Sequence, residues 1–325
     1  MILVTGATGF LGRNLVPRLL RAGYEVRIVA RQQSEVAPLL GPGVEVATVD
    51  DIGDVAGLRA ACAGCEAVIH AAALFRMWGP LLTFWQTNVA GTAAVLEAMA
   101  AAGVQRLVHV SSVVVVGRVE PGRVVDEVHS CRPLDHYQRT KLEAERLVLA
   151  HARQGALAVT VVRPGALYGP WGTYAFNRLF FVEPLRGWRI KVNGGRHITF
   201  PAYSGDVADG IIAALEKGGS GELYNLSGES LSHNAVNEIV SDLAGISRRR
   251  FNVPTAAVLA LARGLTALSR FTQREPFYPI DLAHYVFQDW HVSSEKARAE
   301  LGFAPRPFVE GARATLQWYR EQGLF

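Results

Sequence analysis

Cysteine is scarce in this chain, which has three in 325 residues. An odd and low count excludes a disulfide framework and is typical of a reducing compartment, so we expect a cytoplasmic protein. Cys62 and Cys65 have the redox spacing C-x-x-C, but they follow a predicted helix and precede a strand. A tight helix-to-strand turn is therefore the favoured interpretation. No second cysteine or histidine pair would complete a zinc site, and we expect no metal.

The chain also lacks a large excess of charge and any long hydrophobic run. Lys and Arg number 33 against 29 Asp and Glu, a formal net charge of +4. The densest basic run, Arg248-Arg249-Arg250, is short, so we expect no nucleic-acid partner. The longest apolar stretch outside the predicted strands, residues 254–271, contains Arg263 and Arg270, and we expect no integral membrane segment. A core helix or pocket wall is favoured for it, with a membrane-surface helix as the alternative.

Strand-like and helix-like segments alternate along the first half of this chain, which is 50% apolar overall. Runs rich in Val and Ile occur at 2–5, 25–30, 44–49, 67–70, 106–110 and 159–163, and helical spacing occurs at 11–21, 84–102 and 137–154. The strands lack in–out alternation, as in a parallel sheet covered on both faces. We therefore predict an α/β fold, a doubly wound parallel (Rossmann) sheet with a smaller, mainly C-terminal substrate lobe.

The pattern loosens after Arg163, where Gly, Pro and aromatic residues become frequent. We assign residues 1–165 to a dinucleotide-binding domain and most of 166–325 to a substrate-binding lobe. Segments near 204–228 are expected to return to the first domain, as a helix over 206–217 and a strand over 222–226.

A glycine-rich turn follows the first predicted strand and opens the first helix, with the sequence Thr5-Gly6-Ala7-Thr8-Gly9-Phe10-Leu11-Gly12. Gly6 allows the tight turn, Gly9 lets the backbone approach a pyrophosphate, and Gly12 lets the helix pack on the sheet. The helix N-terminus then presents free N–H groups to the phosphates. The strand–turn–helix context predicts a dinucleotide site.

Arg31 follows the second strand, where an Asp or Glu would bind the 2′-hydroxyl of the adenosine ribose. The first acid after that strand is Glu35. An arginine can instead hold a 2′-phosphate through charge-assisted hydrogen bonds, so we predict NADP(H) rather than NAD(H). The alternative is that Arg31 is a solvated turn residue.

Tyr137 and Lys141 stand four residues apart, on one face of a predicted helix. A free tyrosine titrates near pH 10, and an ammonium group one turn away draws its pKa down. Ser111 and Ser112 end a predicted strand, at the edge where open α/β sheets bind ligands. A serine there can polarise a substrate carbonyl while Tyr137 transfers the proton.

These motifs together resemble the extended short-chain dehydrogenase/reductase (NAD-dependent epimerase/dehydratase) family. The resemblance rests on the turn 5–12, Asp51-Ile52, His70-Ala71-Ala72, residues 88–92, Ser111-Ser112, Tyr137 with Lys141, residues 163–170 and residues 294–303. It spans nearly the whole chain. It points to the branch of dihydroflavonol reductases, 3β-hydroxysteroid dehydrogenases and hopanoid-associated epimerases.

The resemblance implies a role for each matching position. The catalytic residues would be Ser112, Tyr137 and Lys141, with Ser112 chosen over Ser111 by its spacing from Gly117. Asn88 would brace the neighbouring strand through backbone hydrogen bonds. The cofactor would be held by Gly6, Thr8, Gly9, Phe10, Leu11, Gly12, Arg31, Asp51, Ile52, Ala71, Ala72, Ala73, Tyr137, Lys141, Pro164, Gly165, Ala166 and Leu167.

Departures from the family pattern indicate the substrate class. Val116 stands before Gly117, where sugar-nucleotide epimerases often carry Tyr, and Tyr203-Ser204-Gly205-Asp206 replaces the usual His-Val-Asp-Asp. Aromatic residues gather near the expected mouth, among them Phe180 and Phe181. The substrate pocket is expected to include Phe75, Trp78, Val113, Tyr168, Trp171 and Phe176.

The favoured function is an NADP(H)-dependent oxidoreductase that moves hydride between the nicotinamide and a carbonyl or secondary alcohol. Its substrate would be a small, apolar or aromatic molecule. The alternative is a nucleotide-sugar epimerase or dehydratase, and the third possibility is a non-enzymatic NADP(H) sensor. A homodimer through the helices at 84–102 and 137–154 is possible, although packing on the sheet explains their apolar faces equally well.

Overall fold

The core of the protein is a seven-stranded parallel sheet, seen in a computed structural model that describes residues 1–155 and 157–325, apart from the side chain of Arg270. Its order is β12-β7-β5-β4-β1-β2-β3. The strands are β1 (Ile2–Thr5), β2 (Val26–Arg31), β3 (Val44–Val49), β4 (Ala67–His70), β5 (Arg106–Val110), β7 (Ala158–Pro164) and β12 (Leu223–Leu226). The chain winds outward in both directions from β1 and β4, which confirms the predicted doubly wound fold.

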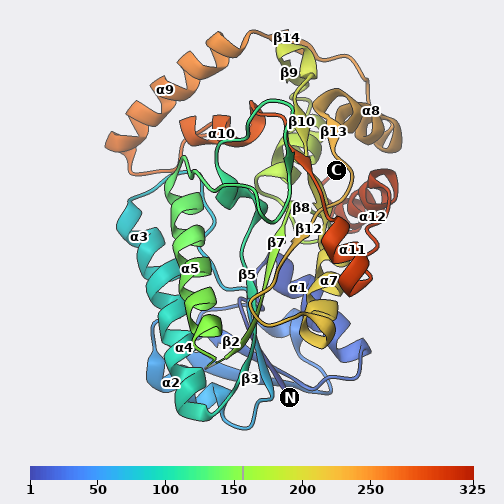
Figure 1. The fold of residues 1–325 in the computed structure, drawn as a ribbon. Helices are drawn as coiled ribbons and strands as arrows, with labels where there is room; N and C mark the ends of the chain where they lie inside the picture. Colours follow the sequence, from blue (N-terminus) through green and yellow to red (C-terminus); the bar gives the residue numbers. More distant parts are fainter. Residues whose placement is uncertain (156) are drawn as a thin grey trace.

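Helices cover both faces of the sheet (Figure 1). One layer holds α1 (Phe10–Arg21), α7 (Ser204–Lys217) and α11 (Glu295–Leu301); the other holds α2 (Val55–Cys62), α4 (Gly91–Ala102) and α5 (His136–Arg153). Buried aliphatic side chains fill the two interfaces, around Leu15 and Ile28 on one face and Leu58 and Val95 on the other. The inner strands such as β1 and β4 are buried on both faces, which is why they do not alternate, whereas β3 at the edge of the sheet is partly exposed.

One expected boundary differs in the structure. The helix expected from Phe84 begins earlier, because α3 (Leu81–Trp85), a π-helical turn (Gln86–Ala90) and α4 follow one another without a break. Pro80, in an extended conformation, starts this run. The strand expected at 222–226 is β12, and it pairs with β7 across the boundary placed near residue 165. That boundary itself stays a prediction.

The remaining elements form a lobe beyond the carboxyl ends of the strands (Figure 1). Its helices are α6 (Glu183–Leu185), α8 (His233–Ala244), α9 (Thr255–Thr272), α10 (Ala283–Val286) and α12 (Phe308–Glu321). Short strands pair as β6 (Val124–Val125) with β15 (His291–Val292), β8 (Ala166–Tyr168) with β11 (Pro201–Tyr203), β9 (Ile190–Val192) with β14 (Phe251–Val253), and β10 (Ile198–Thr199) with β13 (Leu231–Ser232). Its core is aromatic, with Phe181, Phe308 and Tyr319 fully buried.

The described residues contain no helix long and apolar enough to cross a membrane. Within the same residues, no three His, Cys, Asp or Glu side chains gather as a metal site.

Candidate active site

The glycine-rich turn connects β1 to α1. Gly6 has a φ of +71°, and a Cβ there would stand 2.6 Å from the backbone nitrogen of Ala72. A Cβ at Gly12 would stand 2.4 Å from the Cα of Ala7. At Gly9 a Cβ would meet only the Gly6 carbonyl oxygen, at 3.2 Å. Space is therefore free in front of Gly9 and of the N-terminus of α1, which has no capping side chain, and it fits a pyrophosphate.

The last residue of β2, Arg31, presents an exposed guanidinium group. Arg31 is exposed, its backbone N–H donates to Ser34 Oγ at 3.2 Å, and among the described residues its guanidinium has no ion-pair partner. Glu35 is engaged, because its carboxylate accepts from Arg13 at 2.7 Å. This edge of the turn therefore offers a positive group to an adenosine ribose, while Glu35, the first acid after β2, is already paired.

Asp51 and Ile52 lie just after β3. The Asp51 carboxylate accepts from the Gly53 N–H at 2.6 Å, which shapes the turn. Ile52 packs against Gly91 at the start of α4, where a Cβ would come within 2.5 Å of the Ile52 side chain. The absence of a side chain at Gly91 thus makes room for Ile52, which the resemblance assigns to the adenine site.

Asn88 braces the loop that follows β4. Its amide oxygen accepts from the Leu74 N–H at 2.7 Å, and its amide nitrogen donates to Leu74 O at 3.3 Å and to Thr140 Oγ1 at 3.0 Å. Asn88 therefore joins this loop to α5, the helix of the expected catalytic pair.

A cavity of about 350 Å³ extends from this turn into the lobe. Its lining includes the expected cofactor residues Phe10, Leu11, Ala71, Ala73, Tyr137, Lys141, Pro164, Gly165, Ala166 and Leu167. The expected substrate residues Phe75, Trp171 and Phe176 line it too. The structure thus brings these two groups of residues to one space at the carboxyl edge of the sheet.

The three expected catalytic side chains line this same cavity. Ser112 follows β5, and its hydroxyl is hydrogen-bonded to Tyr137 near the start of α5. Lys141, one helical turn further on, is buried and donates from Nζ to the Val110 carbonyl oxygen at 2.6 Å. Phe75 packs on the Tyr137 ring, with 4.7 Å between ring centroids.

Burial sets the proton affinities of this group. It raises the pKa of Tyr137 above the ordinary 10.0, although the hydrogen bond with Ser112 opposes this. It lowers the pKa of Lys141 from 10.5 to about 8, while the Glu145 carboxylate opposes that shift. The described groups that shift the pKa of Tyr137 do not include Lys141, contrary to our expectation. The physical reason is that the ammonium group is directed to Val110 on β5.

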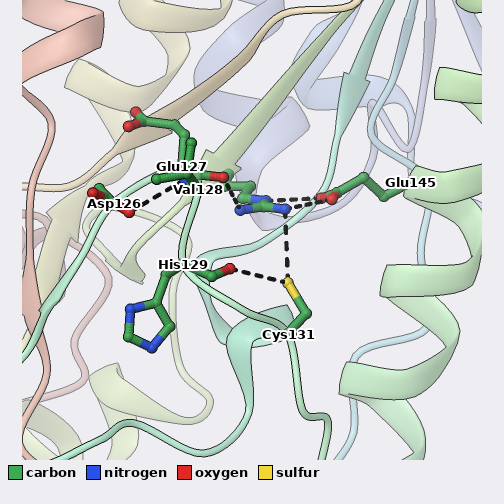
Figure 2. Close-up of polar contacts among 7 residues, drawn as sticks. Asp126, Glu127, Val128, His129, Cys131 and Glu145 are labelled. Atoms are coloured by element: carbon green, nitrogen blue, oxygen red, sulfur yellow. Dashed lines mark hydrogen bonds and ion pairs between the residues drawn. The ribbon is translucent and has the colours of Figure 1, made fainter.

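A buried ion pair fixes the catalytic helix to the sheet. Arg163, near the end of β7, donates from Nε to Glu145 Oε2 of α5 at 2.9 Å, and both side chains are at most 4% exposed. Figure 2 shows the Glu127 carbonyl on the side of the guanidinium opposite Glu145, with Cys131 also in contact. Glu145 lies two turns beyond Tyr137 on α5, so the pair holds the face that carries Tyr137 and Lys141.

The lobe closes the cavity with residues that sequence analysis missed: Tyr174, Leu179, Thr199, Phe200, His233, Leu282, Tyr285 and Val286. Tyr285 Oη donates to Asp135 Oδ2 at 2.7 Å, and Asp135 caps α5 through the Gln138 N–H. Burial lowers the pKa of His233 to about 4, so its imidazole is neutral near pH 7. These residues come from separate segments, and no local motif marks them.

Three expected pocket residues lie elsewhere. Val113 is fully buried in a cluster with Trp290, and Tyr168 packs between Phe181 and Phe308. Trp78 is half-buried and is not among the lining residues. All three are apolar or aromatic and stand in segments expected to reach the mouth of the pocket. Val113 and Tyr168 instead belong to hydrophobic clusters of the protein interior.

The apolar stretch at 254–271 also differs from our favoured interpretation. It forms most of α9, where Ala262 and Ser269 are the only buried side chains among those described. The described residues of α9 contribute nothing to the cavity lining. The helix is therefore neither a core helix nor a pocket wall.

Comparison with known proteins identifies the family. The model of the NAD dependent epimerase/dehydratase family matches residues 2–227. The chain belongs to this family. It is 33% identical to a 4-hydroxy-2-methyl-3-oxo-4-farnesyl-3,4-dihydroquinoline-1-oxide ketoreductase from Stigmatella aurantiaca, over 93% of this chain and 91% of the relative. It is 32% identical to sterol demethylase protein B from Methylococcus capsulatus, over 99% of each chain.

Solved structures share the whole fold of this chain. A crystal structure of a double mutant of the dTDP-glucose 4,6-dehydratase DesIV from Streptomyces venezuelae, with NAD and DAU bound, superposes with a TM-score of 0.80. It is 25% identical and covers 100% of each chain. This epimerase/dehydratase family member is therefore an NAD(P)-dependent enzyme of the oxidoreductase type, and the family resemblance stated from its motifs is confirmed.

Proposed function

We propose that the protein catalyses reversible hydride transfer between NADP(H) and a carbonyl or secondary alcohol of a small apolar or aromatic molecule. The observation that carries this proposal is the cavity that joins the glycine-rich turn to Ser112, Tyr137 and Lys141 within a mainly apolar wall. Acid–base groups within a mainly apolar wall suit carbonyl reduction.

The reaction divides between the cofactor and the chain. A bound nicotinamide supplies the hydride and, when oxidised, a positive charge that favours the tyrosinate. In reduction, Ser112 donates a hydrogen bond to the substrate carbonyl oxygen, and Tyr137 gives that oxygen its phenolic proton. Lys141 would hold the cofactor by donating hydrogen bonds from its ammonium group to the ribose hydroxyls.

The lining of the cavity supports an uncharged substrate. Among its described residues Lys141 is the one ionic side chain, and Phe176, Phe180, Phe200 and Leu282 form much of the wall. The diphosphate of a nucleotide-sugar substrate would bind weakly against this wall, because its charged oxygens would lose their water without gaining cationic partners. The named activities of the ketoreductase and sterol relatives support the same class.

A spectroscopic assay tests this function. Purified protein with NADPH and a panel of aromatic and polycyclic ketones should show loss of the reduced-nicotinamide absorbance. Turnover of a nucleotide sugar on tightly bound cofactor, with no net absorbance change, would assign the epimerase or dehydratase activity instead. Cofactor binding with no turnover of any compound would assign a sensor.

We also propose that NADP(H) is preferred over NAD(H), through Arg31. Its guanidinium is exposed beside the turn, while Glu35 is paired with Arg13. Replacement of Arg31→Gln should raise the Michaelis constant for NADPH about tenfold or more, since hydrogen bonds to charged groups contribute about 1.5–3 kcal/mol. The constant for NADH should not change. A lower constant for NADH than for NADPH in the unaltered enzyme would overturn this proposal.

The two-part division of the chain near residue 165 and a homodimer through α4 and α5 remain proposals. A shallow hollow between these helices, lined by Leu96, Ala100, Leu147 and Leu157 among others, supports the second. Light scattering on the protein as it leaves a size-exclusion column would measure its mass in solution. Twice the 35.2 kDa mass of one chain would support the homodimer, and the mass of one chain would contradict it.

A further inference from the structure

Helix α9 turns an apolar face outward. Leu261, Leu268 and Phe271 are 60%, 57% and 86% exposed. Ala257 and Gly264 are also exposed and fall on the same stripe, since the five positions are spaced by three and four residues. An ordinary surface helix places charged and polar residues outside. The outer face of α9 therefore has no partner that the described residues provide.

Exposed aromatic side chains extend this face toward β9 and β14. Phe277 follows α9, is 53% exposed and lies 6.2 Å from the ring of Trp188, which is 60% exposed. Phe251 on β14 is 80% exposed and pairs in register with Ile190 on β9. Figure 1 shows α9, β9 and β14 at the same end of the molecule, away from the N-terminus. We call the set Trp188, Phe251, Leu261, Leu268, Phe271 and Phe277 the α9 surface.

Basic residues accompany the α9 surface in sequence. The segments 184–205 and 243–274 contain ten Lys and Arg and no Asp or Glu. Because the whole chain has a formal charge of +4, the remainder is net acidic. Arg186, Arg249, Arg263 and Arg274 are exposed in these segments. Exposed apolar side chains and cations thus occur together at one end of the protein.

We propose that the α9 surface docks on an anionic phospholipid bilayer. Its apolar side chains would enter the boundary between headgroups and acyl chains, and the surrounding arginines would meet lipid phosphates. A second copy of this chain fits less well, because docking the same basic surfaces face to face brings like charges together. The surplus of exposed arginines beside these apolar side chains matches a partner with a negatively charged surface and an apolar interior, such as an anionic bilayer.

The docked helix lies over the wall of the substrate cavity. Thr266 Oγ1 of α9 accepts from the Ile280 N–H at 3.1 Å. The chain then continues into α10, and Leu282 and Val286 line the cavity. If the protein docks through α9, an apolar substrate dissolved in the bilayer would reach the cavity on the side of Leu282 and Val286. This route for the substrate rests on the proposed function. The docking itself does not depend on it.

Vesicle binding tests the docking without any substrate. The full-length protein should co-sediment with vesicles of phosphatidylcholine and phosphatidylglycerol, much less with phosphatidylcholine alone, and less as salt is added. The triple variant Leu261→Ser, Leu268→Ser, Phe271→Ser should bind the anionic vesicles about tenfold or more weakly. Its fold and NADP(H) binding should be retained, because these side chains are exposed.

Leu40→Ser is the matched control, since Leu40 is 55% exposed but follows Leu39 near β2, in the sheet region. It should bind vesicles as the unaltered protein does. Equal binding by the triple variant and the unaltered protein, or no binding to anionic vesicles, would overturn the proposal. So would a triple variant whose mass in solution falls from dimer to monomer, because that would assign the surface to a second copy. Catalytic failure with intact vesicle binding would overturn the proposed function alone.

Discussion

The sheet region and the lobe meet at one cavity but hold their functional side chains differently. In the sheet region, Lys141 bonds to a strand carbonyl and Glu145 pairs with Arg163, all within the protein interior. In the lobe, aromatic rings such as Phe176 and Phe180 form the wall by packing. The sheet region therefore positions reacting groups through buried polar contacts, and the lobe shapes a space through apolar surfaces that tolerate change.

The largest expected difference between the two regions is in the loss of unfolding free energy when the carboxylate of an ion pair is neutralised. Glu145→Gln leaves the Arg163 guanidinium buried without its carboxylate, which we expect to cost about 3–5 kcal/mol of unfolding free energy. Asp242→Asn in the lobe removes the partner of Arg248, but that pair is exposed to solvent, so we expect little or no loss of unfolding free energy. Urea unfolding of both variants measures the contrast.

Equal losses in the two variants would contradict this account of the sheet region. The turnover number is a second readout, which separates the role of Glu145 in positioning α5 from its contribution to stability. If Glu145 holds α5, the turnover number of Glu145→Gln should fall at temperatures where the variant is still folded, while Asp242→Asn keeps the unaltered value.

The next contrast concerns the two tyrosines of the cavity. Tyr137→Phe removes the proton donor, so turnover should fall by about two or more orders of magnitude. Tyr174→Phe on the lobe side removes a hydrogen bond to Glu275 and should change mainly the Michaelis constant of the substrate. Steady-state kinetics measure both, with NADPH binding by fluorescence as the control. Near-normal turnover of Tyr137→Phe with cofactor bound would refute the catalytic assignment.

The same contrast explains how far sequence alone could go. The glycine turn, the Ser112 strand end and the Tyr137–Lys141 helix each lie within one strand–turn or helix segment. Their spacing therefore predicts their placement, and the structure brings Ser112, Tyr137 and Lys141 to one cavity. The sheet strands were predictable for a similar reason, since burial on both faces demands continuous apolar runs.

The rest depended on contacts between distant segments. His233 and Tyr285 reach the cavity from α8 and α10, and no periodicity links them to β5. Tyr168 and Val113 are apolar enough for a pocket but fill the hydrophobic clusters instead. The direction of Lys141 toward Val110 was equally hidden, because it depends on how α5 packs on β5. The apolar pattern of α9 indicates that the helix packs against an apolar partner, but it does not identify that partner as the protein core, a second chain or a membrane.

The smallest expected effect is that of one glycine substitution in the lobe, Gly264→Ala, which is compared with the more disruptive Gly12→Ala in the sheet region. Gly264→Ala in α9 adds a methyl group that meets no heavy atom within 4 Å, inside a helix. It should raise the unfolding free energy by about 0.5–1 kcal/mol, because alanine loses less backbone freedom than glycine. Gly12→Ala in α1 gains the same propensity but places its Cβ 2.4 Å from Ala7, so it should lower stability and NADP(H) binding. Thermal unfolding of the two variants gives the sign, and a shift of the same sign in both would mean that propensity, rather than close packing of α1 on the glycine turn, decides these positions.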